Sequence, residues 1–277
     1  MPELPEVETI RRDLHDVLSG RMLGPVEVSG TRSVRRHGDS GEVPARSDGR
    51  RVLGVERQGK FLLIRLQGPD VLVVHLGMSG QLLLGAPGAA RPPHTHVTFG
   101  VSGGAELRFV DPRTFGQIFV TTAGSGGDVP ELAHLGFDAL RPGRGGTRLA
   151  AALAGRRAPV KAVLMDQRRV AGIGNLYADE ILFGAGVRPD RPAGSLAPNE
   201  VRRTARAMVE TLRQAITCRG SSLADQQYRD VYGAVGGYQQ HHRVYGRQGQ
   251  PCTRCRTPVV RSRGGGRSTF FCPTCQR

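Results

Sequence analysis

The stretch "CTRCRTPVVRSRGGGRSTFFCPTC", residues 252–275, decides the fold of the carboxyl end of the chain. It contains two Cys-x2-Cys pairs with sixteen residues between them, and these pairs hold four of the five cysteines: Cys252, Cys255, Cys272 and Cys275. Each pair presents two thiolates from one tight turn, and two such turns complete the tetrahedral shell of a structural zinc ion. Two disulfides are the alternative, which a cytoplasmic chain disfavours. The spacing therefore predicts one structural zinc ion, held by the four cysteines.

The charge balance of the whole chain indicates a polyanionic partner. The 277 residues include 39 Lys plus Arg against 24 Asp plus Glu, which gives a net charge of +15. The carboxyl end is the extreme case, because residues 243–277 contain eight arginines and no acidic residue. Solubility alone rarely calls for so much charge of one sign, so nucleic acid is the favoured partner. A membrane surface is less favoured, because no basic amphipathic helix with an aromatic-rich face stands out.

The sequence has the features of a cytoplasmic protein. No run approaches the ~18 apolar residues of a membrane span. The first residues, "MPELPEVETIRRDL", are acidic and lack the apolar stretch of a secretory signal. We therefore expect a cytoplasmic protein with no membrane partner. Cys218 has no partner at ligand spacing, and we expect it to be a buried small apolar residue.

The pattern of apolar residues changes twice along the chain. Residues 5–19 have the period of an amphipathic helix, and residues 22–122 contain eight short runs that predict the strands of a β-sandwich or barrel. Residues 130–225 are helical in pattern, and Asn199 is the expected cap of the last long helix. Residues 226–250 have no clear period and many glycines, so we interpret them as a long surface loop.

The lysine content is unusual. Lys60, in "RQGKFLLIRL" at 57–66, and Lys161 are the only lysines, whereas 37 residues are arginine. A lysine ammonium can release a proton, but a guanidinium in a protein cannot. Lys60 is therefore a candidate proton carrier. Chance in an arginine-biased chain is an equally good explanation on the residues alone.

The first three residues suggest amine chemistry. Methionine before proline is normally removed, which would make Pro2 the amino end. An α-amino group titrates near ~8, against ~10.4 for lysine, so far more of it is neutral at pH 7 and able to attack a carbonyl carbon. Glu3 beside it is a candidate general acid or base. The alternative is an ordinary segment that leads into a helix, and on the residues alone this alternative is favoured.

Seven segments, which extend over nearly the whole chain, resemble bacterial formamidopyrimidine-DNA glycosylases and occur in the order of that family. They are "MPELPEVET" at 1–9, "GKFLLI" at 59–64, "HLGMSGQL" at 75–82, "DPRTFG" at 111–116, "GIGNLYADE" at 172–180, "VYGRQG" at 244–249 and "RSTFFCPTCQR" at 267–277. Each motif alone is of middling specificity, but the ordered set is very specific. The resemblance implies an enzyme that removes oxidised purines, such as 8-oxoguanine and formamidopyrimidines, from DNA.

The resemblance also implies the fold class, which is α+β with several domains. A catalytic domain at 1–124 would contain an amino-terminal helix and a two-sheet antiparallel β-sandwich. A helical domain at 130–243 would contain a helix–two-turn–helix and a lesion-covering loop, and a β-hairpin zinc finger would follow at 244–277. The implied partner is double-stranded DNA with oxidised purines or abasic sites, bound by a monomer.

The catalytic residues of the family match four positions of this chain. The resemblance implies that Pro2 attacks C1′ of the damaged nucleotide and forms a Schiff base, with Glu3 as proton donor and acceptor. Lys60 would donate a proton during base release and elimination. Arg267 would grip the phosphate and assist δ-elimination. Base loss and two eliminations would leave a one-nucleotide gap.

The DNA contacts of the family also match positions of this chain. The damaged nucleotide must be extruded from the duplex, and the resemblance implies that Met78, Arg113 and Phe115 fill the hole. Core packing is the alternative for a lone Met or Phe, but the turns around these residues favour exposed tips. The further implied phosphate contacts are His75, His94, Arg156, Lys161 and Asn175. For the two histidines, an ordinary surface or hydrogen-bonded role is the alternative.

The chain departs from the family pattern at two places. Many relatives have a second arginine where this chain has Thr114, and many have a Gly-Tyr-Phe loop where this chain reads Gly236-Gly237-Tyr238. That loop covers the flipped base in the family, so the second departure bears on lesion preference.

Two other functions are compatible with the motifs. One is a sister enzyme of the endonuclease VIII type, which prefers oxidised pyrimidines but usually has Gly where this chain has Leu4. The other is a non-catalytic lesion-binding homologue. The joint presence of Pro2, Glu3, Lys60 and Arg267 argues against a protein that only binds.

Overall fold

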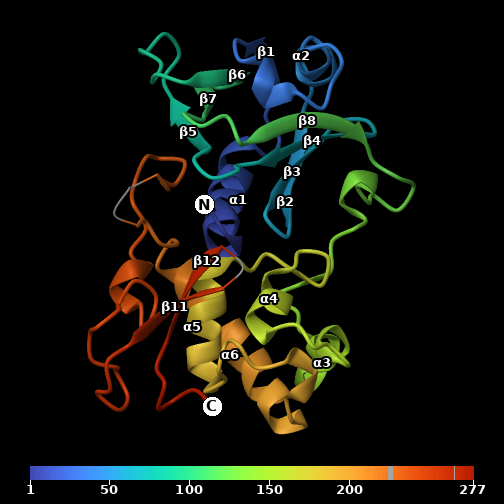
Figure 1. Cartoon of the computed structure of the whole chain (residues 1–277). Coiled ribbons are helices and arrows are strands. Elements are labelled where there is room, and N and C mark those ends of the chain that lie inside the picture. Colours follow the sequence, from blue (N-terminus) through green and yellow to red (C-terminus); the bar gives the residue numbers. More distant parts are fainter. Residues whose placement is uncertain (224–226, 265) are drawn as a thin grey trace. The chain divides into compact units, whose positions relative to one another are not determined.

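The computed structural model describes residues 1–223, 227–264 and 266–277 (Figure 1). The chain forms two compact units. The first contains Met1–Ala133 and Cys218–Gly237, and the second contains His134–Thr217 and Tyr238–Arg277. The described residues of the segment 218–237 therefore belong to the β-rich unit, whereas the sequence analysis placed this segment in the helical part of the chain.

The first unit contains one long helix, α1 (Leu4–Leu18), and two antiparallel four-stranded sheets. The strands are β1 (Leu23–Val28), β2 (Val52–Gln58), β3 (Phe61–Leu66), β4 (Asp70–His75), β5 (Gln81–Gly85), β6 (Thr95–Val101), β7 (Ala105–Val110) and β8 (Gln117–Thr122). One sheet has the strand order β1-β6-β7-β5 and the other β2-β3-β4-β8. The predicted helix and sheets are confirmed. The sequence analysis missed η1 (Thr31–Val34) and α2 (Glu42–Ser47), and this unit also contains η2 (Pro130–Leu132).

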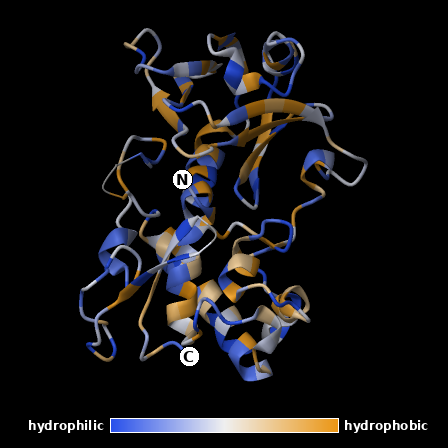
Figure 2. Cartoon of the chain, viewed as in Figure 1, coloured by the Kyte–Doolittle hydropathy of each residue, from blue (hydrophilic) through white to orange (hydrophobic). Residues whose placement is uncertain are grey.

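The hydrophobic core of the first unit joins α1 to both sheets. Val7, Ile10 and Leu14 of α1 are fully buried in the same cluster as Leu62 of β3 and Phe99 of β6. Figure 2 shows hydrophobic residues concentrated along the strands of this unit. Burial of each such side chain contributes about 1.5–3 kcal/mol. Because α1 begins directly after the first three residues, this packing also fixes the amino end of the chain.

The second unit is helical and ends in a β-hairpin. Its longer elements are α3 (Thr147–Leu153), α4 (Val160–Met165), α5 (Asn175–Ala185), α6 (Pro198–Thr217), β11 (Val260–Gly264) and β12 (Arg267–Phe271). Its short elements are β9 (Phe137–Asp138), η3 (Arg144–Gly146), β10 (Val170–Ala171), η4 (Ala193–Ser195) and η5 (Tyr238–His241). In the described parts of the chain, no helix has both the length and the apolar composition to cross a membrane.

Two local expectations in the helical region are wrong. Helix α6 begins at Pro198, so Asn199 lies inside the helix and does not cap it. The Ala197 N–H instead donates to the Glu200 carboxylate at 2.8 Å, which satisfies a donor that would otherwise be left unpaired at the helix start. Cys218, expected to be buried, is only partly buried.

The interpretation of residues 226–250 as a surface loop is wrong at several positions. Tyr228, Val231 and Tyr238 are buried. The first residue of this segment lies outside the described residues. Hydrophobic periodicity misses such a segment because an irregular backbone buries its side chains one at a time.

Candidate active site

The amino end is buried where α1 begins. Pro2 and Glu3 are buried, whereas Met1 is 53% exposed. The N–H of Glu3 donates to the Glu6 carboxylate at 2.8 Å, which holds the backbone directly after Pro2. Removal of the exposed Met1 would turn the Pro2 nitrogen into an amine whose position is fixed by α1.

A two-residue turn between β2 and β3 carries Lys60. Gly59 has a left-handed φ of 58°, which glycine adopts without steric cost, and Lys60 is 7% exposed. Arg57 ties this turn to α1, because its Nη1 donates to the Gly59 carbonyl at 2.9 Å and its Nε donates to the Glu8 carboxylate at 3.0 Å. The turn is therefore anchored to the helix that carries the amino end.

Glu8 is the centre of this anchor. Its carboxylate lies 3.0 Å from the guanidinium nitrogens of Arg11, Arg12 and Arg57. Burial would raise the pKa of Glu8, but the hydrogen bond from Arg11 and the charges of Arg57 and Arg11 outweigh burial and hold this pKa below its usual value. Glu8 therefore stays ionised at neutral pH and acts as an anchor, not as a proton donor.

His75 lies at the end of β4, beside the Lys60 turn. The strand register pairs it with Phe61, and the two rings are 4.6 Å apart. Its Nδ1 accepts the N–H of Gly77 at 3.2 Å. Burial, and then the positive charge of Lys60, lower the pKa of His75 to about 4, so the ring is neutral at pH 7. The predicted phosphate contact would therefore be a neutral hydrogen bond from Nε2 and not an ion pair.

The residues predicted to fill the DNA gap lie on exposed loops of the first unit. Met78 is 39% exposed and Phe115 is 45% exposed, which favours loop tips over core packing. The Arg113 guanidinium carbon lies 5.1 Å from the centroid of the Phe115 ring, within the range of a cation–π contact. Arg113 and Phe115 thus form one group, as their predicted joint role requires.

Asp111 joins the two loops. It is fully buried, and its carboxylate accepts the Ser79 hydroxyl at 2.5 Å and the Gly116 N–H at 2.6 Å. The loops also touch through their backbones, because a Cβ added at Gly77 would lie 2.5 Å from the carbonyl carbon of Phe115. The positions of the two loop tips therefore depend on each other.

His94 lies next to this loop pair. It is exposed and has a left-handed φ of 64°, and its carbonyl accepts the Asp111 N–H at 3.0 Å. A non-glycine residue in this conformation is uncommon and is held there by its surroundings. The imidazole is available for the predicted phosphate contact, which stays a prediction.

In the second unit, Arg156 and Arg267 are both exposed. Arg267 opens β12, and the carbonyl of the next residue, Ser268, accepts hydrogen bonds from Lys161 Nζ at 3.0 Å and Asn175 Nδ2 at 3.1 Å. Lys161 and Asn175 therefore hold the hairpin directly beside Arg267. Their predicted phosphate contacts, like that of Arg156, stay predictions.

Two adjacent carboxylates of α5 fasten the hairpin region. Asp179 is fully buried, pairs with Lys161 at 2.8 Å and accepts the Phe270 N–H at 2.9 Å. Burial raises the pKa of Asp179 to about 7, although the charge of Lys161 acts in the opposite direction. Glu180, also fully buried, accepts the Val244 N–H at 2.9 Å. Helix α5 thus holds both the hairpin and the chain that leads into it.

The four predicted zinc ligands lie together in the second unit. Their Sγ atoms are all within 4.8 Å of one another, with Cys252 and Cys275 at 3.9 Å and Cys255 and Cys272 at 3.4 Å. Thiolates bound at ~2.3 Å to one tetrahedral zinc ion are ~3.8 Å apart, so the donor set fits the metal. Within the described residues, no other group of three or more such side chains could hold a metal ion.

Three family models match the sequence: the Formamidopyrimidine-DNA glycosylase N-terminal domain at residues 1–118, the Formamidopyrimidine-DNA glycosylase H2TH domain at 135–227 and the zinc finger found in FPG and IleRS at 249–277. A Formamidopyrimidine-DNA glycosylase of Moorella thermoacetica is 49% identical over 263 residues, which cover 95% of each chain. The chain belongs to the formamidopyrimidine-DNA glycosylase family. A second family member, from Thermus thermophilus, is 45% identical over 276 residues, with 100% of this chain and 98% of the relative covered.

Solved structures of the formamidopyrimidine-DNA glycosylase family have the same fold. The MutM (Fpg) protein of Thermus thermophilus matches with a TM-score of 0.87 at 43% identity, over 99% of this chain and 98% of that chain. The Lactococcus lactis Fpg in complex with abasic-site DNA matches with a TM-score of 0.90 at 28% identity, over 99% of both chains. A mutant of the same Fpg in complex with Fapy-dG DNA matches with a TM-score of 0.90 at 29% identity, over 100% of both chains. The predicted α+β fold, with its helix–two-turn–helix and zinc finger, is confirmed, and so is the structural zinc site.

Sequence reasoning missed the residues that support the site in this glycosylase-family chain. Asp111 opens the segment "DPRTFG", and Asp179 and Glu180 close "GIGNLYADE". The available signal was the position of these carboxylates inside motifs that were otherwise assigned to DNA binding. Their full burial, which makes them anchors, depends on distant parts of the chain and could not be read from the motifs.

Proposed function

We propose that this family member is a bifunctional DNA glycosylase and abasic-site lyase for oxidised purines. The observation that carries the proposal is the full-length match to the formamidopyrimidine-DNA glycosylase family, at 49% identity with one relative. It is supported by the buried Pro2 and Glu3 and by the anchored turn that carries Lys60. The crystallised Lactococcus lactis relatives bind DNA with an abasic site or a Fapy-dG lesion, and we assign the same classes of DNA to this chain. We place its action in the bacterial cytoplasm, as a monomer on double-stranded DNA.

The first step is extrusion of the damaged nucleotide, because C1′ is shielded inside a duplex. Unstacking costs a few kcal/mol per base step, and apolar side chains inserted into the stack offset this cost. Met78 and Phe115 are exposed on loops joined by Asp111, so they suit this role. Arg113, in contact with the Phe115 ring, adds a donor and a positive charge beside the phosphates.

The second step is base release at the amino end. After loss of Met1, the neutral Pro2 amine attacks C1′, the bond from C1′ to the base breaks, and the base leaves with the electron pair and a proton. Glu3 takes the amine proton and Lys60 donates a proton to the leaving base or to O4′. Ring opening then leaves an iminium at Pro2, whose fixed positive charge makes the C2′ hydrogens acidic.

The third step cleaves the strand twice. Removal of a proton from C2′ expels the 3′-phosphate, and removal of a proton from C4′ expels the 5′-phosphate. Arg267, exposed at the start of β12, would neutralise the phosphate that leaves in the second elimination. Water then hydrolyses the adduct and restores the Pro2 amine, and the product is a one-nucleotide gap.

Borohydride trapping tests the proposed enzyme class. Wild-type protein, mixed with abasic duplex DNA and borohydride, should give a covalent adduct through Pro2. The variant Pro2→Leu should retain Met1, because methionine is removed only before small residues, and should bind DNA without forming the adduct. A wild-type protein that binds but is never trapped would be a non-catalytic homologue, and the proposal would fail.

A panel of duplexes tests the proposed lesion class. Each duplex carries a single 8-oxoguanine, formamidopyrimidine or oxidised pyrimidine. The proposal expects faster cleavage of the oxidised purines than of the pyrimidines. The reverse order would contradict the lesion class and leave the enzyme class intact.

A further inference from the structure

In the segment 218–237 of the first unit, the two described arms, 218–223 and 227–237, are joined by hydrogen bonds. The Gly237 N–H donates to the Cys218 carbonyl at 2.9 Å, and the Gly236 N–H donates to the Ser222 hydroxyl at 2.9 Å. The approach is tight, because a Cβ added at Gly236 would lie 2.3 Å from the Gly220 carbonyl oxygen. The two arms, 218–223 and 227–237, therefore move as one piece in the part of the segment that the structure describes.

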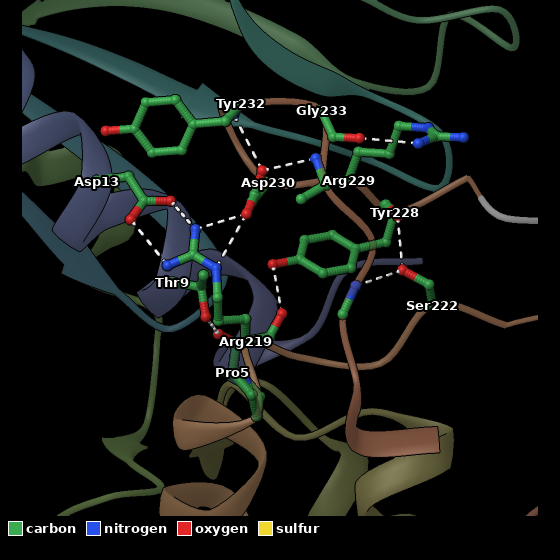
Figure 3. A network of polar contacts seen from close by, with 12 residues as sticks. Pro5, Thr9, Asp13, Arg219, Ser222, Tyr228, Arg229, Asp230, Tyr232 and Gly233 are labelled. Carbon is green, nitrogen blue, oxygen red and sulfur yellow. Dashed lines mark hydrogen bonds and ion pairs between the residues drawn. The ribbon is translucent and has the colours of Figure 1, made fainter. Parts of the chain in front are cut away.

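Arg219 fastens this segment to α1 (Figure 3). Its Nη1 and Nη2 donate to the two carboxylate oxygens of Asp13 at 3.2 and 2.5 Å, and its Nε and Nη2 donate to Asp230 at 2.9 and 2.6 Å. Asp13 and Asp230 are both buried. Hydrogen bonding to Asp13 raises the pKa of Arg219 above its already high usual value. Burial of the guanidinium acts in the opposite direction, and the hydrogen bond to Asp230 adds to the increase. One guanidinium thus links α1 to both arms of the segment.

The backbone of Arg219 is unusual for a side chain of its size. Its φ is 58°, in the left-handed region that favours glycine. A non-glycine residue persists there only when its surroundings hold it, and such residues cluster at functional positions. Here the ion pairs to Asp13 and Asp230 hold the side chain, and the Tyr228 hydroxyl donates to the Arg219 carbonyl at 3.0 Å.

Asp230 transmits this anchor to the second arm. While Oδ2 binds Arg219, Oδ1 accepts the Tyr232 N–H at 3.0 Å and the Ala234 N–H at 2.9 Å. The Asp230 N–H in turn donates to the Ala234 carbonyl at 2.9 Å. The whole turn 230–234 is therefore organised around the carboxylate that Arg219 holds.

The first arm reaches the amino end through one carboxylate. Two residues after Arg219, the Ser221 N–H donates to Glu6 Oε1 at 2.8 Å, and Glu6 Oε2 accepts the Glu3 N–H at 2.8 Å. The fit around Glu6 leaves little room, because a Cβ added at Gly220 would lie 2.9 Å from Glu6 Oε1. A shift of the arm would therefore turn the Glu6 carboxylate and change the position of the backbone beside Pro2.

We propose that Arg219 is a positioning residue for the reaction at Pro2, acting through Ser221, Glu6 and the N–H of Glu3. This inference rests on the proposed function, because the readout is adduct formation by the Pro2 amine. Arg219 itself touches neither the amine nor Glu3 in the proposed relay. Its contribution is to hold the arm that orients the Glu6 carboxylate, with Asp13 as its partner on α1.

The decisive variant is Arg219→Gly. Glycine relieves the left-handed backbone and so offsets part of the cost of leaving the buried Asp13 and Asp230 without their cation. Urea unfolding checks that the variant is folded at the assay temperature, and a loss of rate in the folded variant then reports the missing ion pairs. Arg206→Ala is the matched control, because Arg206 is an exposed arginine whose Nε lies 2.7 Å from the Glu210 carboxylate, so the change removes the same charge and an ion pair at the surface. Rates of borohydride trapping on abasic DNA are measured at saturating protein, and Kd for the same DNA is measured separately.

Arg219→Gly should slow trapping by about tenfold, because a small misplacement of a reacting group has effects of this size or larger. Its Kd should match that of Arg206→Ala, whose trapping rate should equal that of the wild type. Asp13→Asn should also slow trapping, and the double variant should lose no more than Arg219→Gly alone, because the pair between Arg219 and Asp13 is already broken in that variant. Wild-type rates in Arg219→Gly, or losses that add in the double variant, would overturn the proposal.

Hydrogen exchange separates failure of this inference from failure of the proposed function. If the wild-type protein forms no adduct, the proposed function fails, and with it the catalytic part of the inference. The structural part is still decided by the amides of Ser221 and Glu3, which should exchange about tenfold faster in Arg219→Gly than in Arg206→Ala, because exchange reports local opening. Equal exchange in the two variants would overturn the relay itself.

Discussion

Replacing Asp111 by asparagine should loosen the Met78 and Phe115 loops together. The buried carboxylate accepts one hydrogen bond from the Ser79 hydroxyl at 2.5 Å and one from the Gly116 N–H at 2.6 Å. An asparagine oxygen can replace only one of these two acceptors. If that oxygen stays toward Ser79, the new NH2 group faces the Gly116 N–H, and this buried donor loses its partner. If the oxygen turns toward Gly116, the NH2 group faces the Arg113 N–H, which donates to the Ser79-side oxygen at 3.3 Å in the wild type. In either orientation one backbone donor loses its bond to this side chain.

The expected magnitude follows from that lost bond. A hydrogen bond to a charged group contributes about 1.5–3 kcal/mol, and a buried donor left unsatisfied costs about 1–3 kcal/mol. The two terms overlap, so Asp111→Asn should lower the free energy of unfolding by about 2–4 kcal/mol. Asp39→Asn is the matched control, because Asp39 is exposed and its carboxylate accepts the Gly41 N–H at 2.9 Å at the surface of the same unit. That variant should change the free energy by less than about 0.5 kcal/mol.

Urea unfolding at pH 7 measures both variants against the wild type. Single-turnover excision of 8-oxoguanine then tests the consequence for function, and a displacement of about 1 Å at the loops should slow it about 100-fold. Under these conditions Asp39→Asn should excise at the wild-type rate. If Asp111→Asn loses less than about 1 kcal/mol, within the ordinary range of surface changes, the carboxylate does not hold the loops and the reasoning is refuted.

Four further outcomes are expected. Intact-mass measurement of active protein should show the loss of Met1, and active protein that retains Met1 would exclude the Schiff-base role of Pro2. Chelation of zinc should lower DNA affinity at least about 100-fold, because a structural zinc site contributes about 10 kcal/mol to the folding of its module. Adding zinc back should restore the affinity, and full cleavage by metal-free protein would contradict the prediction. Lys60→Arg should lose much more activity on an oxidised purine than on a pre-formed abasic site, since only the first requires protonation of a leaving base, and parallel losses would point to positioning alone. The pKa of His75 is about 4 in the folded state, below its usual 6.5, so the folded state favours the neutral ring. The free energy of unfolding should therefore fall as the pH drops from 6.5 toward 4. Between pH 7 and 4.5, urea unfolding should show a loss about 2 kcal/mol larger in the wild type than in His75→Gln, and equal losses would show that this ring titrates normally.

Local chemistry in the sequence predicts most of the longer elements of this protein. The Cys-x2-Cys pairs predict the zinc module because two tight turns suffice to place four sulfurs around one ion. The apolar period of residues 5–19 predicts α1, and the eight apolar runs between 22 and 122 coincide with the eight strands in that range. These features involve residues close together in the chain, so the sequence pattern alone records them.

Only the tertiary structure decided which side chains act together. Arg219 meets Asp13 across 206 positions of sequence, and Ser221 meets Glu6 across 215. Lys161, predicted from the motifs as a phosphate contact, is buried against Asp179 and the hairpin. Periodicity and spacing carry no record of such pairs, because each residue has an ordinary local pattern and acquires its partner only when distant segments pack. The composition made a lysine at position 60 conspicuous, but the anchor of its turn, Arg57 bound to Glu8, exists only because α1 packs against the β2–β3 hairpin.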